Sequence, residues 1–461
     1  MKRLLPWEAV PASTGQRSVL WAEGLRGIAS LLVVTSHLSR SFAYTLITPA
    51  QDSTHTGSFI HLPLLRLPAQ GAPWVSLFFV LTGYVNAMKP IKQARNGNGS
   101  QALSGLAFSA FRRTGRLVLP ATIATIISWV ICQLGLFEIG RTCEAVWIRD
   151  TSPKPGPGVT GSIRLLLANL FTTWTTGFNV YDKNQWTFPF LLKGSMLIFI
   201  TLLATVRIHS NYRILVFLGL YAFNWAGGDP MLGMNIYFGA LLAELSNRLP
   251  PPSMTPRRNP FIRAITGVAL LLGLHVSGYP EVSPEWTSWS QNLAQIGQFI
   301  FPGKDYWRYW TSIGAQLITL AVVISPRMQD MLSHPAFVWL GSVSLPLYLI
   351  HGPLVRSLLA WMLFGWQKPV SYYSQDVNGN LTDPFQRRSF PDGWVFCIVL
   401  PVFLLILLWA SHLWTTWVEP WCASITNRIE EVMCGTETGE KGDLPRTNGC
   451  HGDKGERVTE V

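Results

Sequence analysis

The sequence predicts an all-α protein, a polytopic bundle of about ten transmembrane helices, and three observations favour this fold class. Of its 461 residues, 48% are hydrophobic and only 13% are charged, which is too apolar for an ordinary water-exposed surface. The chain holds 20 Trp, whose indole rings favour the boundary between lipid and water. Its net charge of +11 comes from Lys and Arg that gather beside apolar segments. We therefore expect a lipid bilayer, and no nucleic acid, as a partner.

Ten segments are candidates for membrane spans. A helix needs about 20 mostly apolar residues to cross roughly 30 Å of hydrocarbon, although two of these segments are shorter. The candidates are 24–44, 74–88, 117–137, 186–206, 212–226, 231–245, 261–279, 309–325, 337–364 and 394–417. We expect a membrane domain over 21–425, after a cytoplasmic segment at 1–20 and before a disordered cytoplasmic tail at 426–461.

The charges of the connections predict the topology. Short cytoplasmic loops hold the excess of Lys and Arg. The connection between the second and third candidates is basic and has no acid, carrying Lys89, Lys92, Arg95, Arg112, Arg113 and Arg116. The later even-numbered connections are basic too, so ten spans with both termini in the cytoplasm satisfy the pattern. An endoplasmic-reticulum or other endomembrane site is the default expectation, and a glycosylation sequon at 380–382 falls on the lumenal side.

Two ionisable residues, Arg26 and His37, interrupt the first apolar segment. Such groups are costly at membrane depth and usually mark function. Eleven helical residues return to within roughly 20° of the same direction and rise about 16.5 Å, so the two side chains share a face without touching. This arrangement suits a long ligand with an anionic head and a reactive far end, such as coenzyme A. Alternatively, Arg26 snorkels to the interface and His37 is a satisfied polar group.

Further candidate residues occur in two other segments. Arg112 and Arg116 stand four apart at the expected start of the third helix, where guanidinium forks match phosphate oxygens, although basic residues there also signal topology. Tyr348 and His351 lie three apart in the ninth segment and could line an acceptor pocket or make structural hydrogen bonds. The six Cys show no metal-ligand spacing, so we expect no metal.

With these motifs the sequence resembles the acyltransferase type 3 family of polytopic membrane acyltransferases, especially its fungal members. The resemblance rests on motifs that occur in order between Trp21 and about Glu419. They are Arg26 with ten residues before His37, Phe78 to Tyr84, Arg112 with Arg116, Trp186-Thr187-Phe188-Pro189 with Gly194-Ser195, Tyr237-Phe238-Gly239 leading to Ala243-Glu244-Leu245, and Ser344 to His351.

The resemblance implies transfer of an acyl group, most often acetyl, from acyl-CoA to a hydroxyl of a small molecule. In fungal relatives the acceptor is often a secondary metabolite. His37 would be the catalytic histidine and Arg26 its motif partner, while Arg112 and Arg116 would bind the donor. Acyl-CoA is then a co-substrate, and no permanently bound cofactor is expected.

One departure from the family pattern concerns the segment after the Trp-Thr-x-Pro motif. Similar fungal sequences carry Glu and then Arg there, whereas this chain has Leu191 and Lys193. Glu23 and Glu244 are candidate substitutes for the missing carboxylate. Two alternatives to a working enzyme stay open, a small-molecule transporter whose pathway the ionisable groups line, and a catalytically impaired family member.

Overall fold

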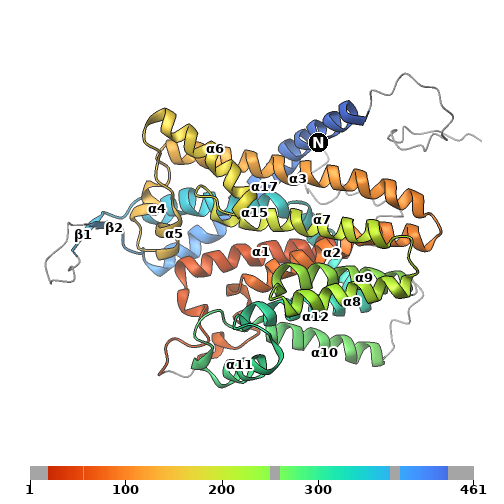
Figure 1. Ribbon diagram of the computed structural model, residues 1–461. Helices are drawn as coiled ribbons and strands as arrows, with labels where there is room; N and C mark the ends of the chain where they lie inside the picture. Colours follow the sequence, from red (N-terminus) through yellow and green to blue (C-terminus); the bar gives the residue numbers. More distant parts are fainter. Residues whose placement is uncertain (1–18, 55–56, 250–259, 374–384, 435–461) are drawn as a thin grey trace, which may run out of the picture.

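Long helices lie alongside one another in the computed structural model, which describes residues 19–54, 57–249, 260–373 and 385–434 (Figure 1). The long elements are α1 (Leu20–Phe42), α2 (Ala72–Arg95), α3 (Gly99–Gln133), α6 (Gly158–Thr176), α7 (Thr187–Thr205), α8 (Ser210–Ala226), α9 (Asn235–Arg248), α10 (Pro260–Ser277), α12 (Tyr306–Ile324), α15 (Ser344–Leu354) and α17 (Gly393–Cys434). The predicted all-α membrane helix bundle is therefore confirmed.

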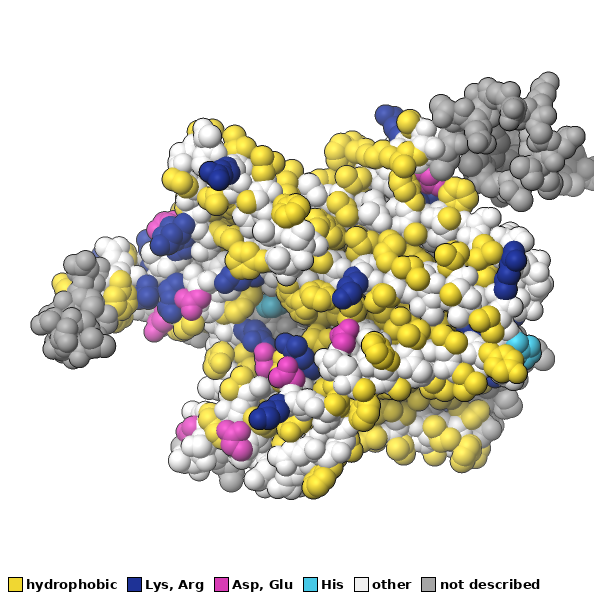
Figure 2. All heavy atoms as spheres, in the orientation of Figure 1, with side chains coloured by type: hydrophobic (Ala, Val, Ile, Leu, Met, Phe, Trp, Pro, Cys, Tyr) yellow, Lys and Arg dark blue, Asp and Glu magenta, His cyan; other side chains and the backbone are white. Residues whose placement is uncertain are grey.

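Short elements connect the long helices. They are α4 (Glu138–Thr142), α5 (Val146–Thr151), α11 (Ser288–Ile300), α13 (Pro326–Leu332), α14 (Pro335–Ser342), α16 (Ala360–Phe364), the strands β1 (Val370–Tyr372) and β2 (Phe385–Arg387), and single helical turns at 44–46, 59–61, 67–69, 183–186, 230–234, 284–286 and 355–359. The two strands form one antiparallel pair, with Ser371 opposite Gln386. On the face drawn in Figure 2, hydrophobic side chains cover much of the bundle and most acidic ones gather over its left half.

Fewer helices than ten satisfy a simple length and hydropathy test for membrane spans. Among the described residues five do so, or six if α12 and α13, bent by 101°, count as one span. Helix α9 is too short, at 14 residues, and α2 packs largely inside the bundle, where its polar side chains meet protein instead of lipid. The number of ten spans stays a prediction.

Helix α3 begins earlier than the predicted span at 117–137. It starts at Gly99, since no Pro or turn motif interrupts the segment before Pro120. The basic residues Arg112 and Arg116 consequently lie within the helix, more than three turns from its first residue, and not at its start as the sequence suggested.

A close parallel contact joins α2 to α9. A Cβ on Gly83 would lie 2.0 Å from the Ile236 carbonyl oxygen, and one on Gly239 would lie 2.1 Å from that of Val80. Only glycine permits these approaches, which explains the small residues in the Phe78 to Tyr84 motif. The contact fixes α2, whose opposite side contributes Phe78 to the cavity described below.

Two sequence expectations fall at the edge of the described residues. The boundary placed at residue 426 lies inside α17, which continues to Cys434, and residues 435–461 lie outside the described part. The glycosylation sequon at 380–382 also lies outside it.

Candidate active site

The start of α1 lies in close contact with α14. A Cβ on Gly27 would lie 2.5 Å from the Gly341 amide nitrogen, so the two backbones touch. This contact brings Arg26 to the start of α15, where its Nε donates to Ser344 Oγ (2.8 Å) and its Nη2 donates to the Gly341 carbonyl (2.9 Å). Arg26 also pairs with Glu23 at 2.5 Å. The arginine is therefore held in one position by three partners.

Arg26 lies on the wall of a cavity of about 340 Å³, formed by α1, α2, α3, α7, α15 and α17. The outer part of the wall is ionic, with Arg26, Arg113 and Arg116 facing Glu23 and Glu419. The inner part is mainly apolar and aromatic, lined by Val75, Phe78, Phe79, Leu117, Phe188, Leu191, Leu345 and Tyr348. A cavity with a charged mouth and an apolar interior suits an anionic ligand that carries an apolar arm.

The structure separates the two arginines of the predicted phosphate clamp. Arg116 lines the cavity, but Arg112 turns to α17, where its Nε and Nη2 donate to the two carboxylate oxygens of Glu430 at 2.7 and 3.1 Å. Arg113, which sequence reasoning treated only as a neighbour, lies on the cavity wall and donates to Ser195 Oγ at 3.2 Å. The cavity thus offers Arg113 together with Arg116.

The carboxylates considered as substitutes for the missing family Glu also separate. Glu23 lines the cavity, whereas Glu244 is fully buried and pairs with Arg213 on α8. Glu419 lines the cavity and its Oε1 has no hydrogen-bond partner among the described residues. Leu191 lines the same wall. Glu23 and Glu419 are therefore the carboxylates placed to balance the cavity arginines.

The second predicted pair, Tyr348 and His351, lies at and just beyond the inner end of the cavity. The Tyr348 hydroxyl accepts a hydrogen bond from Thr187 Oγ1 (3.0 Å) and donates to the Asn184 carbonyl (3.1 Å). His351 is fully buried one turn further along α15, and its ring centre lies 5.2 Å from that of His37. The two histidines therefore form a pair.

The hydrogen bonds of His351 define its tautomer. Its Nδ1 lies 2.8 Å from the Tyr348 carbonyl and 3.1 Å from the Leu347 carbonyl, and carbonyl oxygens only accept, so Nδ1 carries the hydrogen. Its Nε2 then accepts from Asn184 Nδ2 at 3.1 Å. His37, in contrast, is partly exposed, packs 4.9 Å from the Trp147 ring, and has a buried Nδ1 without a partner among the described residues. Of the two, only His37 has a ring nitrogen, Nδ1, without a hydrogen-bond partner in the described part of the chain.

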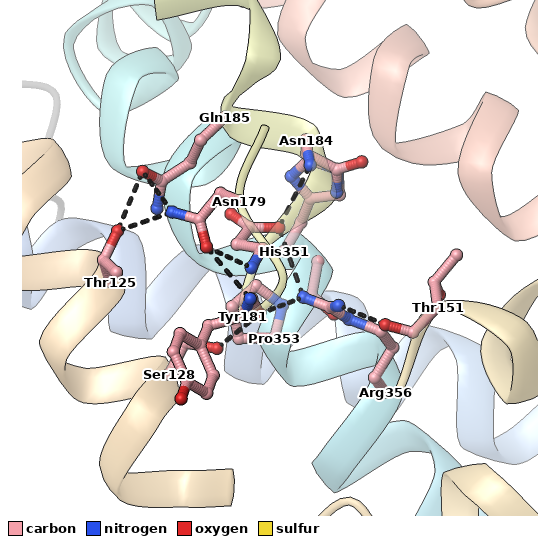
Figure 3. Close-up of polar contacts among 12 residues, drawn as sticks. Thr125, Ser128, Thr151, Asn179, Tyr181, Asn184, Gln185, His351, Pro353 and Arg356 are labelled. Atoms are coloured by element: carbon pink, nitrogen blue, oxygen red, sulfur yellow. Dashed lines mark hydrogen bonds and ion pairs between the residues drawn. The ribbon is translucent and has the colours of Figure 1, made fainter. Parts of the chain in front are cut away.

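A buried polar network includes Asn184, whose backbone N–H donates to Asp182 Oδ1 at 3.3 Å (Figure 3). Asn179 accepts backbone N–H bonds from Tyr181 and Asp182 at 2.9 and 3.0 Å, and its amide donates to Thr125 on α3 at 3.0 Å. Asp182 pairs with Arg356 at 3.2 Å, both side chains being buried. Burial raises the pKa of Asp182, which precedes the span of α7, to about 6, although Arg356 opposes this shift. The loop is thus fixed at the bundle interior.

The course of α15 places Arg356 and His351 on this loop. Pro353 lacks an N–H, and the helix continues as a π turn over 355–359. Arg356 lies in that turn and donates to the carbonyls of Thr151 and Tyr181 at 2.7 and 2.8 Å. A Cβ on Gly352 would lie 2.4 Å from Asn184 Nδ2 and 2.6 Å from Asp182 Oδ1, so a larger residue would displace these hydrogen-bonded side chains.

The site differs from the sequence prediction in one further respect. Among the described residues, Arg26 belongs to the wall of this cavity and His37 does not. Tyr348 closes the inner end, and His351 and His37 lie beyond it. The predicted passage along one face of α1 is replaced by a cavity followed by a short series of polar side chains on α15 and α1.

Sequence reasoning missed Asp182, Asn184 and Arg356. Arg356 interrupts an apolar segment as Arg26 does, so the rule that flagged Arg26 could have found it. Asn179, Asp182, Asn184 and Gln185 form a run of polar residues before the Trp186 motif, but only the fold reveals that they are buried.

Comparisons with known proteins identify the family of this chain. The model of the family described as an acyltransferase domain, Acyl_transf_3, matches residues 19–412. The chain is 26% identical over 372 residues to O-acetyltransferase PaAT-1 of Phomopsis amygdali, covering 74% of this chain and 73% of that protein. It is 25% identical to Acyltransferase R4 of a Phoma species, covering 87% and 93% of the two chains, and 23% identical to Acyltransferase clz18 of Cochliobolus lunatus, covering 77% and 86%. No solved structure matches the chain significantly.

Proposed function

Because this chain belongs to the acyltransferase type 3 family and is an acyltransferase, we propose that it transfers an acyl group, foremost acetyl, from acyl-CoA to a hydroxyl of a small molecule. The names of its fungal relatives support an acceptor from secondary metabolism. The observation that carries the proposal is the His37 ring, whose Nδ1 has no hydrogen-bond partner among the residues described, beside His351 and near an arginine-lined cavity.

The cavity is the proposed binding site for the acyl donor. Arg113 and Arg116 bind the phosphates of the nucleotide, and Arg26, fixed by Ser344, lies at the same mouth. The apolar inner wall receives the arm that ends in the thioester. Since Tyr348 closes this wall, its side chain must turn aside for the thioester to reach the histidine pair.

His37 is the proposed general base. The acceptor oxygen attacks the thioester carbonyl carbon while His37 takes the hydroxyl proton. The C–S bond then breaks, the new C–O ester bond remains, and the thiolate leaves and is protonated by the imidazolium. An imidazole suits this role because its ordinary pKa lies close to neutral pH.

His351 and Asn184 are proposed as positioning residues. Asn184 occupies Nε2 of His351, so His351 does not compete with His37 for the acceptor proton in this arrangement. Its buried ring packs against that of His37 and restricts its orientation. Orientation of a reacting group contributes strongly to rate.

A transfer assay tests the proposal. Purified protein is incubated with labelled acetyl-CoA and candidate hydroxyl acceptors, and labelled ester is measured. His37→Ala should lower turnover by roughly 10²- to 10⁴-fold. His275→Ala is a matched control, because His275 is also partly exposed and packs 5.8 Å from a Trp ring, on the remote helix α10. Unchanged turnover in His37→Ala would exclude the proposed base.

The same assay separates the rival functions. A transporter moves its substrate without forming labelled ester, and family membership argues against it. An impaired member would form no ester with any donor or acceptor, and Leu191 in place of the family Glu is the sequence feature that suggests it.

A further inference from the structure

A second cavity lies at the end of the bundle where α2 and α9 end and α3 and α8 begin, at the right in Figure 1. It is open and measures about 880 Å³. Its described wall contains no acidic residue, and its basic residues come from three separate segments: Arg95, Arg207, His209, Arg213 and Arg248. The right-hand edge of the face in Figure 2 likewise shows basic and His side chains without acidic ones.

Positive charge exceeds negative charge at this cavity. The carboxylate of Glu244, which is not part of the wall, is fully buried. It pairs with Arg213 and lies 3.9 Å from Arg95. Among the described residues Glu244 thus pairs with two of the four guanidinium groups, and mutual repulsion among the cations favours the binding of an anion.

Two of the arginines are already oriented. Arg248 Nη2 donates to Ser210 Oγ and Asn211 Oδ1, each at 2.8 Å, and Arg95 Nη1 donates to Ser210 Oγ at 3.4 Å. Side chains held in this way lose little freedom when a ligand binds. Guanidinium groups from separate segments can then contact several oxygens of one phosphate.

The backbone around the cavity adds further donors. Helices α3 and α8 start at Gly99 and Ser210 on its wall, and helix starts present free N–H groups and a positive dipole end. A Cβ on Gly97 would meet nothing within 4 Å, and one on Gly99 would meet only Arg207 Cγ at 3.9 Å. The backbone there is open to a ligand.

We propose that this cavity is a binding site for a phosphate-bearing anion, supplied by a lipid headgroup or by a soluble phosphate compound. It is separate from the donor cavity, since Ser100 on its wall and Arg113 on the other lie thirteen residues, or about 20 Å, apart along α3. The site takes no part in the proposed acyl transfer. The basic connections predict that it faces the cytoplasm, where anionic lipids are found.

Binding to the purified full-length protein in neutral detergent tests the proposal. The probes are short-chain phosphatidylinositol bisphosphate, inositol trisphosphate and inorganic phosphate, each titrated by calorimetry. The test variant Arg207→Gln with Arg248→Gln leaves the buried Arg213–Glu244 pair intact. The control variant Arg263→Gln removes an exposed arginine from the start of α10, outside the cavity.

Saturable binding that the double variant weakens at least about tenfold, and the control leaves unchanged, supports the site, because a hydrogen bond to a charged group is worth about 1.5–3 kcal/mol. Binding of the lipid probe alone identifies a headgroup, whereas binding of a soluble probe identifies a free phosphate compound. Absence of binding, or equal affinity in the double variant, overturns the proposal. So does competition by adenosine 3′,5′-bisphosphate, which would assign the cavity to the acyl donor. None of these readouts requires acyl transfer.

Discussion

The adjacent arginines Arg112 and Arg113 provide a matched test of where the acyl donor binds. They differ by one position on α3, yet Arg112 pairs with Glu430 on α17 and Arg113 lies on the cavity wall. Replacing each by Gln removes the same charge at nearly the same depth. Only the change at Arg113 should weaken binding of acyl-CoA.

The expected magnitude follows from the contacts. A charge-assisted hydrogen bond to a phosphate contributes about 1.5–3 kcal/mol, so Arg113→Gln should raise KM for acyl-CoA roughly 10- to 150-fold. Since this binding is equal in ground and transition states, kcat should change little. Arg112 is 45% exposed but Glu430 is only 10% exposed, so Arg112→Gln should lower stability while leaving KM within about twofold.

The assay is initial-rate measurement with labelled acetyl-CoA over a wide concentration range, with thermal unfolding recorded for both variants. The Ser195→Ala variant is a useful addition, because it removes the hydroxyl that orients Arg113 and should give a smaller increase in KM. An equal rise in KM for Arg112→Gln and Arg113→Gln, or a rise in Arg112→Gln alone, would refute the assignment of donor binding to the cavity.

Three further experiments probe the rest of the site. Gly352→Ala forces a Cβ into the polar loop and should abolish activity and lower the unfolding temperature. The control Gly267→Ala, whose Cβ meets nothing within 4 Å, should do neither. Normal activity in Gly352→Ala would contradict the packing. Arg356→Met leaves a buried carboxylate unpaired and should cost about 3–5 kcal/mol in unfolding experiments, so a neutral effect would count against the ion pair. Glu419→Gln should reduce turnover, and adding Leu191→Glu to this variant should restore it. If turnover is not restored, Glu419 does not replace the family carboxylate.

The sequence predicted the fold well because its signals are local. Apolar segments and basic connections follow from how each residue interacts with lipid or with the cytoplasmic leaflet, and both can be read without knowing which helices touch. The predicted start of α3 was wrong because the first turns of the helix are polar. Hydropathy indicates only the apolar part of a helix, even when the helix itself begins earlier.

The site was predicted less completely because it depends on contacts between distant segments. Arg26 was identified as an ionisable residue in an apolar helix, but nothing local indicates that Ser344 would fix it. The choice between Arg112 and Arg113 depends on the position of Glu430, more than 300 residues away. Asn184 looks like an ordinary loop residue until α15 is placed against it.

The closed inner wall at Tyr348 has a consequence for side reactions. Thioesters are activated toward water as well as toward alcohols, so an enzyme that binds one must keep water from its carbonyl carbon. With the Tyr348 hydroxyl engaged by Thr187 and Asn184, a donor in the cavity is shielded from the histidine pair. Hydrolysis of acyl-CoA in the absence of an acceptor should therefore be slow, and Tyr348→Ala should raise the rate of this hydrolysis.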